Sequence, residues 1–290
     1  MRKSKYNKRF YQHHMNKSRN SAAELIRVLL SFYTPNSVID VGCGVGSWLV
    51  EFQAQGITDI RGIDGNYVDR NSLLISPNLF FPADLSEDFS QLFETRFDLA
   101  VCLEVAEHIE PEFSEQFIRS LVSLSDVVLF SAALPYQGGT GHVNENWMEY
   151  WALLFHKYDY LPVDCLRPVI WHNSEISWWY RQNSLIFVQQ KECDRLFPNY
   201  HTRQGDSKPL TRIHPECFLW VYHRDGSCRE HDWDVSYLRN LTKWFKRGDT
   251  QSALVGATSK KSTYNVKFAA KPILIIDWVR RQLMNFLKQL

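Results

Sequence analysis

A glycine-rich turn directly after a short apolar run restricts the fold of this chain more than any other feature. The segment VIDVGCGVGSW places Gly42, Gly44 and Gly46 where an expected strand passes into an expected helix. Glycine permits a positive φ there and lets the backbone approach a ligand, while the free amides of the helix face polar groups on that ligand. Counted from Gly42, the third glycine of the G-x-G-x-x-G fingerprint would fall at Ser47, and counted from Gly44 it would fall at Leu49. The spacing therefore argues against a dehydrogenase.

Apolar runs alternate with helical patterns along residues 21–190. The runs expected to form strands are SVIDVGCG, IRGID, LFFPAD, DLAVCLE, DVVLFSAAL and LPVDCL, and WWYRQNSLIFVQQ is expected to supply the last strand. A capping box from Ser21 to Glu24 is expected to open the first helix, which Pro35 closes. Strands separated by helices predict an α/β fold with a mostly parallel sheet covered on both faces.

Composition and charge set wider limits on the chain. With 290 residues, 44% of them hydrophobic, it can bury a sizeable core. The net charge of +1 is uninformative, but basic residues gather in residues 1–20 and again in residues 243–288. Such ends suit an anionic partner, such as a membrane surface or a phosphorylated glycan, or they are solvated termini.

The sequence predicts a cytoplasmic protein, with peripheral association at the inner face of a membrane as an alternative. Neither a signal peptide nor a membrane-spanning apolar stretch is recognisable, and the six cysteines show no paired framework, so reduced thiols are expected. His214, Cys217, Cys228 and His231 form an H-x-x-C and C-x-x-H pair that would suit zinc. An ordinary hairpin with FLWVYH as one strand is favoured over that site.

Acidic residues end the next two expected strands after the glycine turn. IRGID ends in Asp64, at about the offset where an acid meets a ribose diol, and FFPAD ends in Asp84. Together with VIDVGCGVG and FDLAVCLEVAEHI, these residues make the segment from Ser21 to Gln190 resemble the class I S-adenosylmethionine (SAM)-dependent methyltransferases. The strings GGTGHVNENWMEYW and SWWYRQN resemble those of a bacterial subgroup of this family without an assigned substrate.

The resemblance implies a fold, a cofactor and roles for several residues. The fold would be a Rossmann-like, seven-stranded, mostly parallel sheet with a reversed last strand, and the cofactor would be SAM. Asp40 and the turn from Gly42 to Gly46 would hold the methionine moiety, Asp64 the ribose hydroxyls, and Asp84 with Leu85 the adenine. The chain then divides into a basic arm (1–20), the methyltransferase domain (21–190), an extension (191–247), a linker (248–271) and an amphipathic helix (272–290).

The segment LEVAEH, directly after the fourth expected strand, carries Glu104, Glu107 and His108. If a helical turn follows the strand, their i, i+3 and i+4 spacing points all three to one side. Three interpretations remain open: a structural role, a general base in which His108 or His142 takes a proton from a hydroxyl, and a divalent metal site.

The metal interpretation draws on a narrower resemblance. In ubiquinone-pathway O-methyltransferases and small-RNA 2′-O-methyltransferases, an E-x-x-E-H motif at this place ligates a divalent ion, and the RNA enzymes add a later histidine. Glu104, Glu107 and His108 match that motif, and His142 would be the later histidine, in a donor set that suits magnesium, manganese or zinc. A metal would lower the pKa of a hydroxyl, which favours O-methylation.

The acceptor is expected near PYQGGTGHVNENWMEYW and SWWYRQN, as a hydroxyl on a glycan, a lipid-linked saccharide or another small molecule. Aromatic faces that can stack on a sugar and a cationic hydrogen-bond donor are available in Trp147, Trp151, Trp179, Tyr180 and Arg181. An RNA 2′-O-methyltransferase is the main rival, although the domain lacks the basic bias that nucleic acid requires. A SAM-binding protein without catalysis is the second alternative.

Overall fold

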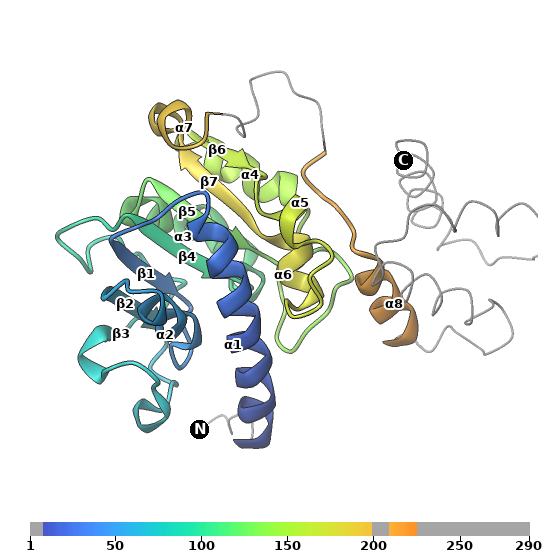
Figure 1. Cartoon of the computed structure of the whole chain (residues 1–290), viewed down its shortest axis with the longest axis horizontal. Helices are drawn as coiled ribbons and strands as arrows, with labels where there is room; N and C mark the ends of the chain where they lie inside the picture. The colour runs from blue at the N-terminus through green and yellow to red at the C-terminus, as the bar shows by residue number, and fades with distance from the viewer. Residues whose placement is uncertain (1–7, 199–208, 225–290) are drawn as a thin grey trace, which may run out of the picture. The chain divides into compact units, whose positions relative to one another are not determined.

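The computed structural model describes residues 8–198 and 209–224, which build a seven-stranded sheet (Figure 1). Along the sheet the strands follow the order β3-β2-β1-β4-β5-β7-β6. In chain order they are β1 (Ser37–Val41), β2 (Asp59–Asp64), β3 (Phe80–Pro82), β4 (Leu99–Leu103), β5 (Val127–Ser131), β6 (Tyr160–Val163) and β7 (Leu185–Gln189).

Strand direction confirms the fold that the sequence predicts. The pairs β2·β3, β1·β2, β1·β4 and β4·β5 are all parallel. Strand β7 lies between β5 and β6 and runs antiparallel to both. The order turns back between β1 and β4, so the loops after these strands meet at the carboxyl edge, where ligands bind in open α/β sheets.

Helices cover both faces of the sheet (Figure 1). The α-helices are α1 (Lys8–Leu30), α2 (Ser47–Ala54), α3 (Ser114–Leu124), α4 (Met148–His156), α5 (Arg167–Ile170), α6 (Trp178–Asn183), α7 (Gln190–Leu196) and α8 (Pro215–Arg224). Short 3₁₀ turns are η1 (Arg70–Ser72), η2 (Pro77–Leu79), η3 (Ala106–His108) and η4 (Pro111–Phe113). Residues of α1, α2, α5, α6 and α7 share one apolar core, whereas α3 and α4 share the other. Both faces of the central strands are therefore buried, as their unbroken apolar runs predict.

Helix α1 begins thirteen residues before the expected capping box, at Lys8, so the prediction of a helix start at Ser21 is wrong. Residues 8–20 contain neither glycine nor proline, and nothing in them ends the helix. Ser21 lies in the helix interior, fully buried, and its Oγ accepts a hydrogen bond from Ser177 N at 3.0 Å. The hydroxyl therefore joins α1 to the start of α6 instead of capping its own helix.

The expected hairpin around FLWVYH is also wrong, because Pro215–Arg224 forms helix α8. His214 is buried, with Nε2 at 3.0 Å from Trp171 O, and Cys217 is buried as well. Cys228 and His231, the other half of the suggested zinc site, lie outside the described residues, as do the linker 248–271 and the helix 272–290. Among the described helices, none combines the length and hydropathy that crossing a bilayer would need.

Candidate functional site

The glycine turn between β1 and α2 adopts the conformation that its sequence predicts. Gly42, Gly44 and Gly46 have φ values of +83°, +55° and +86°. A Cβ added to Gly42 would lie 2.3 Å from Cγ2 of Val105, whereas a Cβ on Gly44 would meet no described atom within 4 Å. The turn therefore packs against the LEVAEH segment on one side and opens a cradle at Gly44 on the other.

Asp64 ends β2 beside this cradle and is 5% exposed. Its carboxylate accepts hydrogen bonds from Gly44 N at 2.7 Å, Gly65 N at 2.6 Å and the Tyr67 hydroxyl at 2.5 Å. Through the bond to Gly44 the carboxylate fixes the glycine turn. Its role toward a ribose stays a prediction, and Tyr67 is a partner that the sequence did not reveal.

Asp40, on β1 just before the turn, is 3% exposed, and its Oδ2 accepts no hydrogen bond from the described part of the chain. Burial, with a smaller contribution from Asp64, raises the pKa of Asp40 to about 8. Such an unpartnered oxygen favours a ligand group that donates a hydrogen bond. Asp84 is exposed after β3, with Oδ1 held by Ser86, and Leu85 packs into the core.

The LEVAEH segment does not form the α-helical turn that would align its three polar residues. Glu104 has a φ of +56°, and the 3₁₀ turn η3 begins only at Ala106. The Glu104 carboxylate accepts hydrogen bonds from Asn183 Nδ2 at 3.1 Å and Gln137 Nε2 at 2.9 Å. Glu104 therefore does not join Glu107 and His108 in one converging group, as regular helical spacing would require, although its charge still acts on Glu107.

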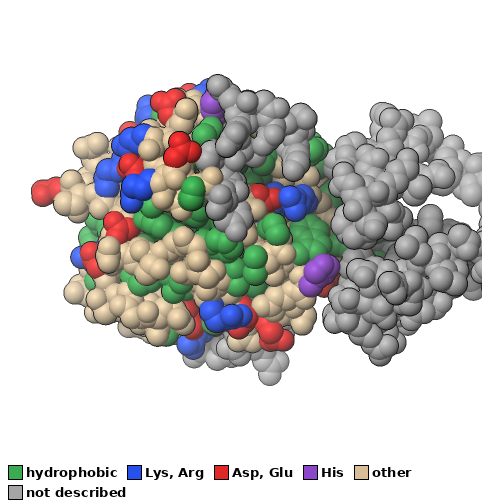
Figure 2. Space-filling view, turned by 45° about the horizontal axis from the view of Figure 1, so that its top comes forward, with side chains coloured by type: hydrophobic (Ala, Val, Ile, Leu, Met, Phe, Trp, Pro, Cys, Tyr) green, Lys and Arg blue, Asp and Glu red, His purple; other side chains and the backbone are tan. Residues whose placement is uncertain are grey.

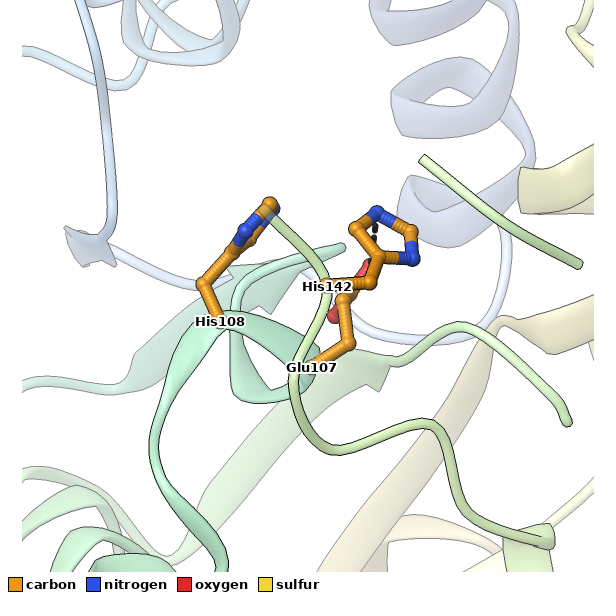
Figure 3. A group of neighbouring side chains, drawn as sticks. All are labelled: Glu107, His108 and His142. Atoms are coloured by element: carbon orange, nitrogen blue, oxygen red, sulfur yellow. Dashed lines mark ion pairs between the residues drawn. The ribbon is translucent and has the colours of Figure 1, made fainter. Parts of the chain in front are cut away.

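Glu107, His108 and His142 converge instead (Figure 3). One ligand atom from each of the three side chains lies within 4.8 Å of the other two. Glu107 and His108 come from η3, whereas His142 comes from the loop between β5 and α4. The two rings meet edge to face with centroids 4.9 Å apart, and Figure 3 shows the Glu107 carboxylate pointing toward His142.

Glu107 is the unusual member of this group. The side chain is 0% exposed, yet neither carboxylate oxygen accepts a hydrogen bond from a described residue. Its Oε1 lies 4.0 Å from Nε2 of His142. Burial, and after it the charge of Glu104, raises the pKa of Glu107 well above its ordinary value. Backbone N–H groups of Glu107 and Ala133 lower this pKa only in part. A buried carboxylate without a well-formed hydrogen bond is costly, so this position favours a cationic or hydrogen-bond-donating ligand.

His108 and His142 are each oriented through Nδ1. Nδ1 of His108 lies 3.2 Å from Gly141 O, and Nδ1 of His142 lies 2.9 Å from Glu145 Oε1. Burial and the neighbouring His142 ring lower the pKa of His108, which favours its neutral form. Neutral imidazoles can serve either as metal ligands or as proton acceptors.

Most of the expected acceptor residues are structural in this fold. Trp151 is 0% exposed and packs on Phe130 in the core. Tyr180 is 8% exposed, with its ring against that of Trp48 at 5.1 Å. An acceptor role for these two side chains is therefore wrong, because neither ring has a face free for a ligand.

Arg181 is likewise buried and does not point to an acceptor. Its Nη2 pairs with Glu216 at 2.9 Å, and its Nη1 donates to Trp171 O at 3.1 Å. Trp179 is half-buried against the core that α1 and α2 share. Trp147, at the start of α4, is 41% exposed and remains a candidate for acceptor contact.

Sequence reasoning gave no role to Gln137 and did not recognise the role of Glu145. Gln137 is 5% exposed. Its backbone carbonyl oxygen accepts the indole N–H of Trp220 at 3.2 Å, and its side-chain amide nitrogen donates to Glu104. Glu145 holds His142. The only sequence signal was the density of polar residues in GGTGHVNEN, which does not show which of them face the site.

The fold, the glycine turn and the acids at the strand ends define the class of this protein: it is a class I SAM-dependent methyltransferase. A family model described as "Methyltransferase domain" matches residues 11–183, more than half of the chain. The chain belongs to that family. A search of curated proteins gave no match.

Solved structures with similar folds are methyltransferases at low sequence identity. Magnesium protoporphyrin IX methyltransferase from Synechocystis is 18% identical, with 64% of this chain and 86% of that chain covered and a TM-score of 0.44. The amino pentose methyltransferase CalS10 from Micromonospora echinaspora is 11% identical, with 65% and 100% covered and a TM-score of 0.46. The methyltransferase domain of a bacterial Hen1 protein is 19% identical, with 60% and 98% covered and a TM-score of 0.42.

Proposed function

We propose that this protein is an O-methyltransferase in which Glu107, His108 and His142 hold a divalent ion beside the cofactor turn and thereby orient an acceptor hydroxyl. The observation that carries the proposal is the buried Glu107 carboxylate, which lacks a described partner and faces two imidazoles. Val105, between Glu104 and this group, touches the glycine turn, so the two sites adjoin.

The residues of the cradle fit SAM. Gly44 leaves open space at its Cα, Asp64 lies at the end of the neighbouring strand, and Asp40 offers an unpaired oxygen for a cationic or N–H group of the methionine moiety. Asp84 and Leu85, at the end of β3, would meet the adenine. When bound, SAM supplies a methyl group on a sulfonium, and the chain's task is to align the acceptor with it.

The donor set of two imidazoles and one carboxylate suits zinc or manganese better than magnesium, which prefers oxygen ligands. A bound ion would lower the pKa of the acceptor hydroxyl. The chain's own contribution is to hold both rings through Nδ1, His108 at Gly141 O and His142 at Glu145. Without a metal, the same Nε2 atoms would take the hydroxyl proton directly, as general bases.

A glycan or another small molecule suits the exposed aromatic residues near the His142 loop, and the described residues on the face drawn in Figure 2 show no continuous basic area for RNA. Around the His142 loop, Tyr136 is 57% exposed and Trp147 is 41% exposed, so aromatic faces are available to a sugar ring. On the face in Figure 2, Lys and Arg side chains alternate with Asp and Glu around apolar side chains. A mixed surface of this kind is a poor binder of a phosphate backbone.

Calorimetric titration of S-adenosylhomocysteine, before and after EDTA treatment, with metal analysis of the same sample, tests the proposal. We expect about one EDTA-removable ion per chain and binding of the cofactor product with or without it. Glu107→Gln should lose the ion and keep the cofactor site, whereas Glu112→Gln, on an exposed turn, should keep both.

Three results would contradict the proposal in different ways. Cofactor binding without any metal would leave His108 and His142 as bases. Failure to bind S-adenosylhomocysteine would remove the cofactor assignment itself. Binding without methyl transfer to any hydroxyl acceptor in a glycan panel would favour the non-catalytic alternative.

A further inference from the structure

Glu145 receives three hydrogen bonds in the loop between β5 and α4. Its Oε2 accepts Tyr136 N at 2.9 Å, and its Oε1 accepts Gly138 N at 2.5 Å. The same Oε1 lies 2.9 Å from Nδ1 of His142. One carboxylate thus connects both ends of a short loop to the imidazole that the loop carries.

These contacts decide which nitrogen of His142 carries the proton. Both carboxylate oxygens of Glu145 already accept backbone N–H groups, so the carboxylate acts as an acceptor, and its contact with Nδ1 requires a proton on Nδ1. In the neutral ring Nε2 then keeps its lone pair. Nε2 is the atom that lies 4.0 Å from the buried carboxylate of Glu107.

The loop is shaped around this ring position. Tyr136 and Gly138 both have a φ of +69°, which is unfavourable for tyrosine, and both donate their N–H to Glu145. A Cβ on Gly139 would lie 2.1 Å from Nε2 of His142, so only glycine leaves space for the ring there. Glu145 therefore stabilises a strained loop and the histidine in one arrangement.

His108 follows the same rule with a different acceptor. Its Nδ1 faces the carbonyl oxygen of Gly141 at 3.2 Å, and a carbonyl can only accept. The two imidazoles would then present equivalent lone pairs at Nε2. For His142 this depends on one side chain, which a single substitution can remove.

We propose that Glu145 is a positioning residue that holds His142 as the Nδ1–H tautomer, so that the Nε2 lone pair is directed toward Glu107 and His108. The inference deepens the proposed function, on which it rests for the role of His142. Removing a carboxylate that orients a ligating histidine in this way typically weakens metal binding by about 10- to 100-fold.

The test compares the full-length protein with Glu145→Ala and Glu145→Gln. In metal-free protein at pH 8, the ¹⁵N shifts of the His142 ring, assigned with a His142→Gln variant, report the tautomer directly. We expect Nδ1–H in the wild type and loss of that preference in Glu145→Ala. Glu145→Gln should retain it, because its amide oxygen can still accept from both Gly138 N and Nδ1.

Titration with Mn²⁺ gives the second readout. Glu145→Ala should bind Mn²⁺ at least about 10-fold more weakly than the wild type, with Glu145→Gln closer to it and Glu112→Ala, on an exposed turn, unchanged. A wild-type His142 protonated at Nε2 would overturn the inference, even if Glu145→Ala failed to fold. So would unchanged tautomer and affinity in Glu145→Ala. If the wild type bound no Mn²⁺, the metal proposal would fail, whereas the ring spectrum would still decide the tautomer.

Discussion

Gly44 is the residue at which backbone conformation and space for a ligand coincide. Its φ of +55° disfavours any side chain, and the volume where a Cβ would stand is open. Gly56, after α2, has a φ of +91° and equally open surroundings, but it lies away from the cradle. A comparison of substitutions at the two positions therefore separates the effect of backbone strain from the effect of contact with a ligand.

We predict that Gly44→Ala and Gly56→Ala each lower the free energy of unfolding by about 1–2 kcal/mol, the cost of a left-handed backbone. Only Gly44→Ala should also weaken binding of S-adenosylhomocysteine, because its methyl group occupies the cradle. Urea denaturation and calorimetry measure the two effects. Equal cofactor affinity in both variants would show that the ligand does not approach Gly44.

Asp40 gives a prediction about pH. Burial raises its pKa from 3.8 to about 8, so the native state binds a proton more tightly than the unfolded chain does. The stability that this proton contributes is present below the unfolded value and is lost as the pH rises through about 8. Relative to Asp40→Asn, the wild type should therefore lose stability from pH 4 to 8, measured by denaturation in the absence of ligand. Parallel pH profiles would contradict the protonated state of Asp40.

The LEVAEH segment departs from the arrangement that its residue spacing predicts. Glu104, Glu107 and His108 have helical spacing, but a positive φ at Glu104 redirects its carboxylate to Asn183, which is 79 positions away in the chain. Local spacing predicts a shared side only where the backbone is regular. The contact with a distant amide cannot be read from the segment itself.

At the scale of elements, helix α8 is attached to the methyltransferase domain although it lies outside the family match. Arg181 of α6 is 4% exposed and pairs with Glu216 of α8. Thr211, just before α8, accepts Met148 N at 3.0 Å. FLWVYH is rich in strand-forming residues, yet it lies within helix α8, so its local propensity does not decide its conformation.

We predict that Arg181→Ala lowers the free energy of unfolding by about 2 kcal/mol, because it removes the buried arginine of an ion pair whose partner, Glu216, is 31% exposed. Arg119→Ala is the matched control, since Arg119 pairs with Asp88 on the surface with both side chains about half exposed, and it should cost at most about 1 kcal/mol. Urea denaturation measures both. Binding of S-adenosylhomocysteine should persist in each variant. If only Arg181→Ala lost this binding while its stability was unchanged, Arg181 would have a binding role after all.

At the scale of the whole molecule, binding of a metal should appear as global stability. The Glu107 carboxylate is buried without a described partner, so an ion that binds there stabilises the native state by mass action. At a Mn²⁺ concentration 100 times its dissociation constant, the wild type should gain about 2.7 kcal/mol, and Glu107→Gln should gain none. Denaturation with and without Mn²⁺ measures the difference. An equal gain in both proteins would place the ion elsewhere.

Residue pattern alone predicted the order of strands and helices in the methyltransferase domain, the glycine turn and the acids at the carboxyl ends of β2 and β3. These features depend on local periodicity and on the backbone freedom of glycine, both of which are written in short segments. Three-dimensional packing was needed to show that Trp151 and Tyr180 lie in the core, that Glu104 contacts Asn183, and that Glu145 contacts His142. Aromatic and polar side chains have the same local pattern whether they face a ligand or a neighbouring element. Contacts between segments distant in the chain determine whether such a side chain faces a ligand or packs against a neighbouring element.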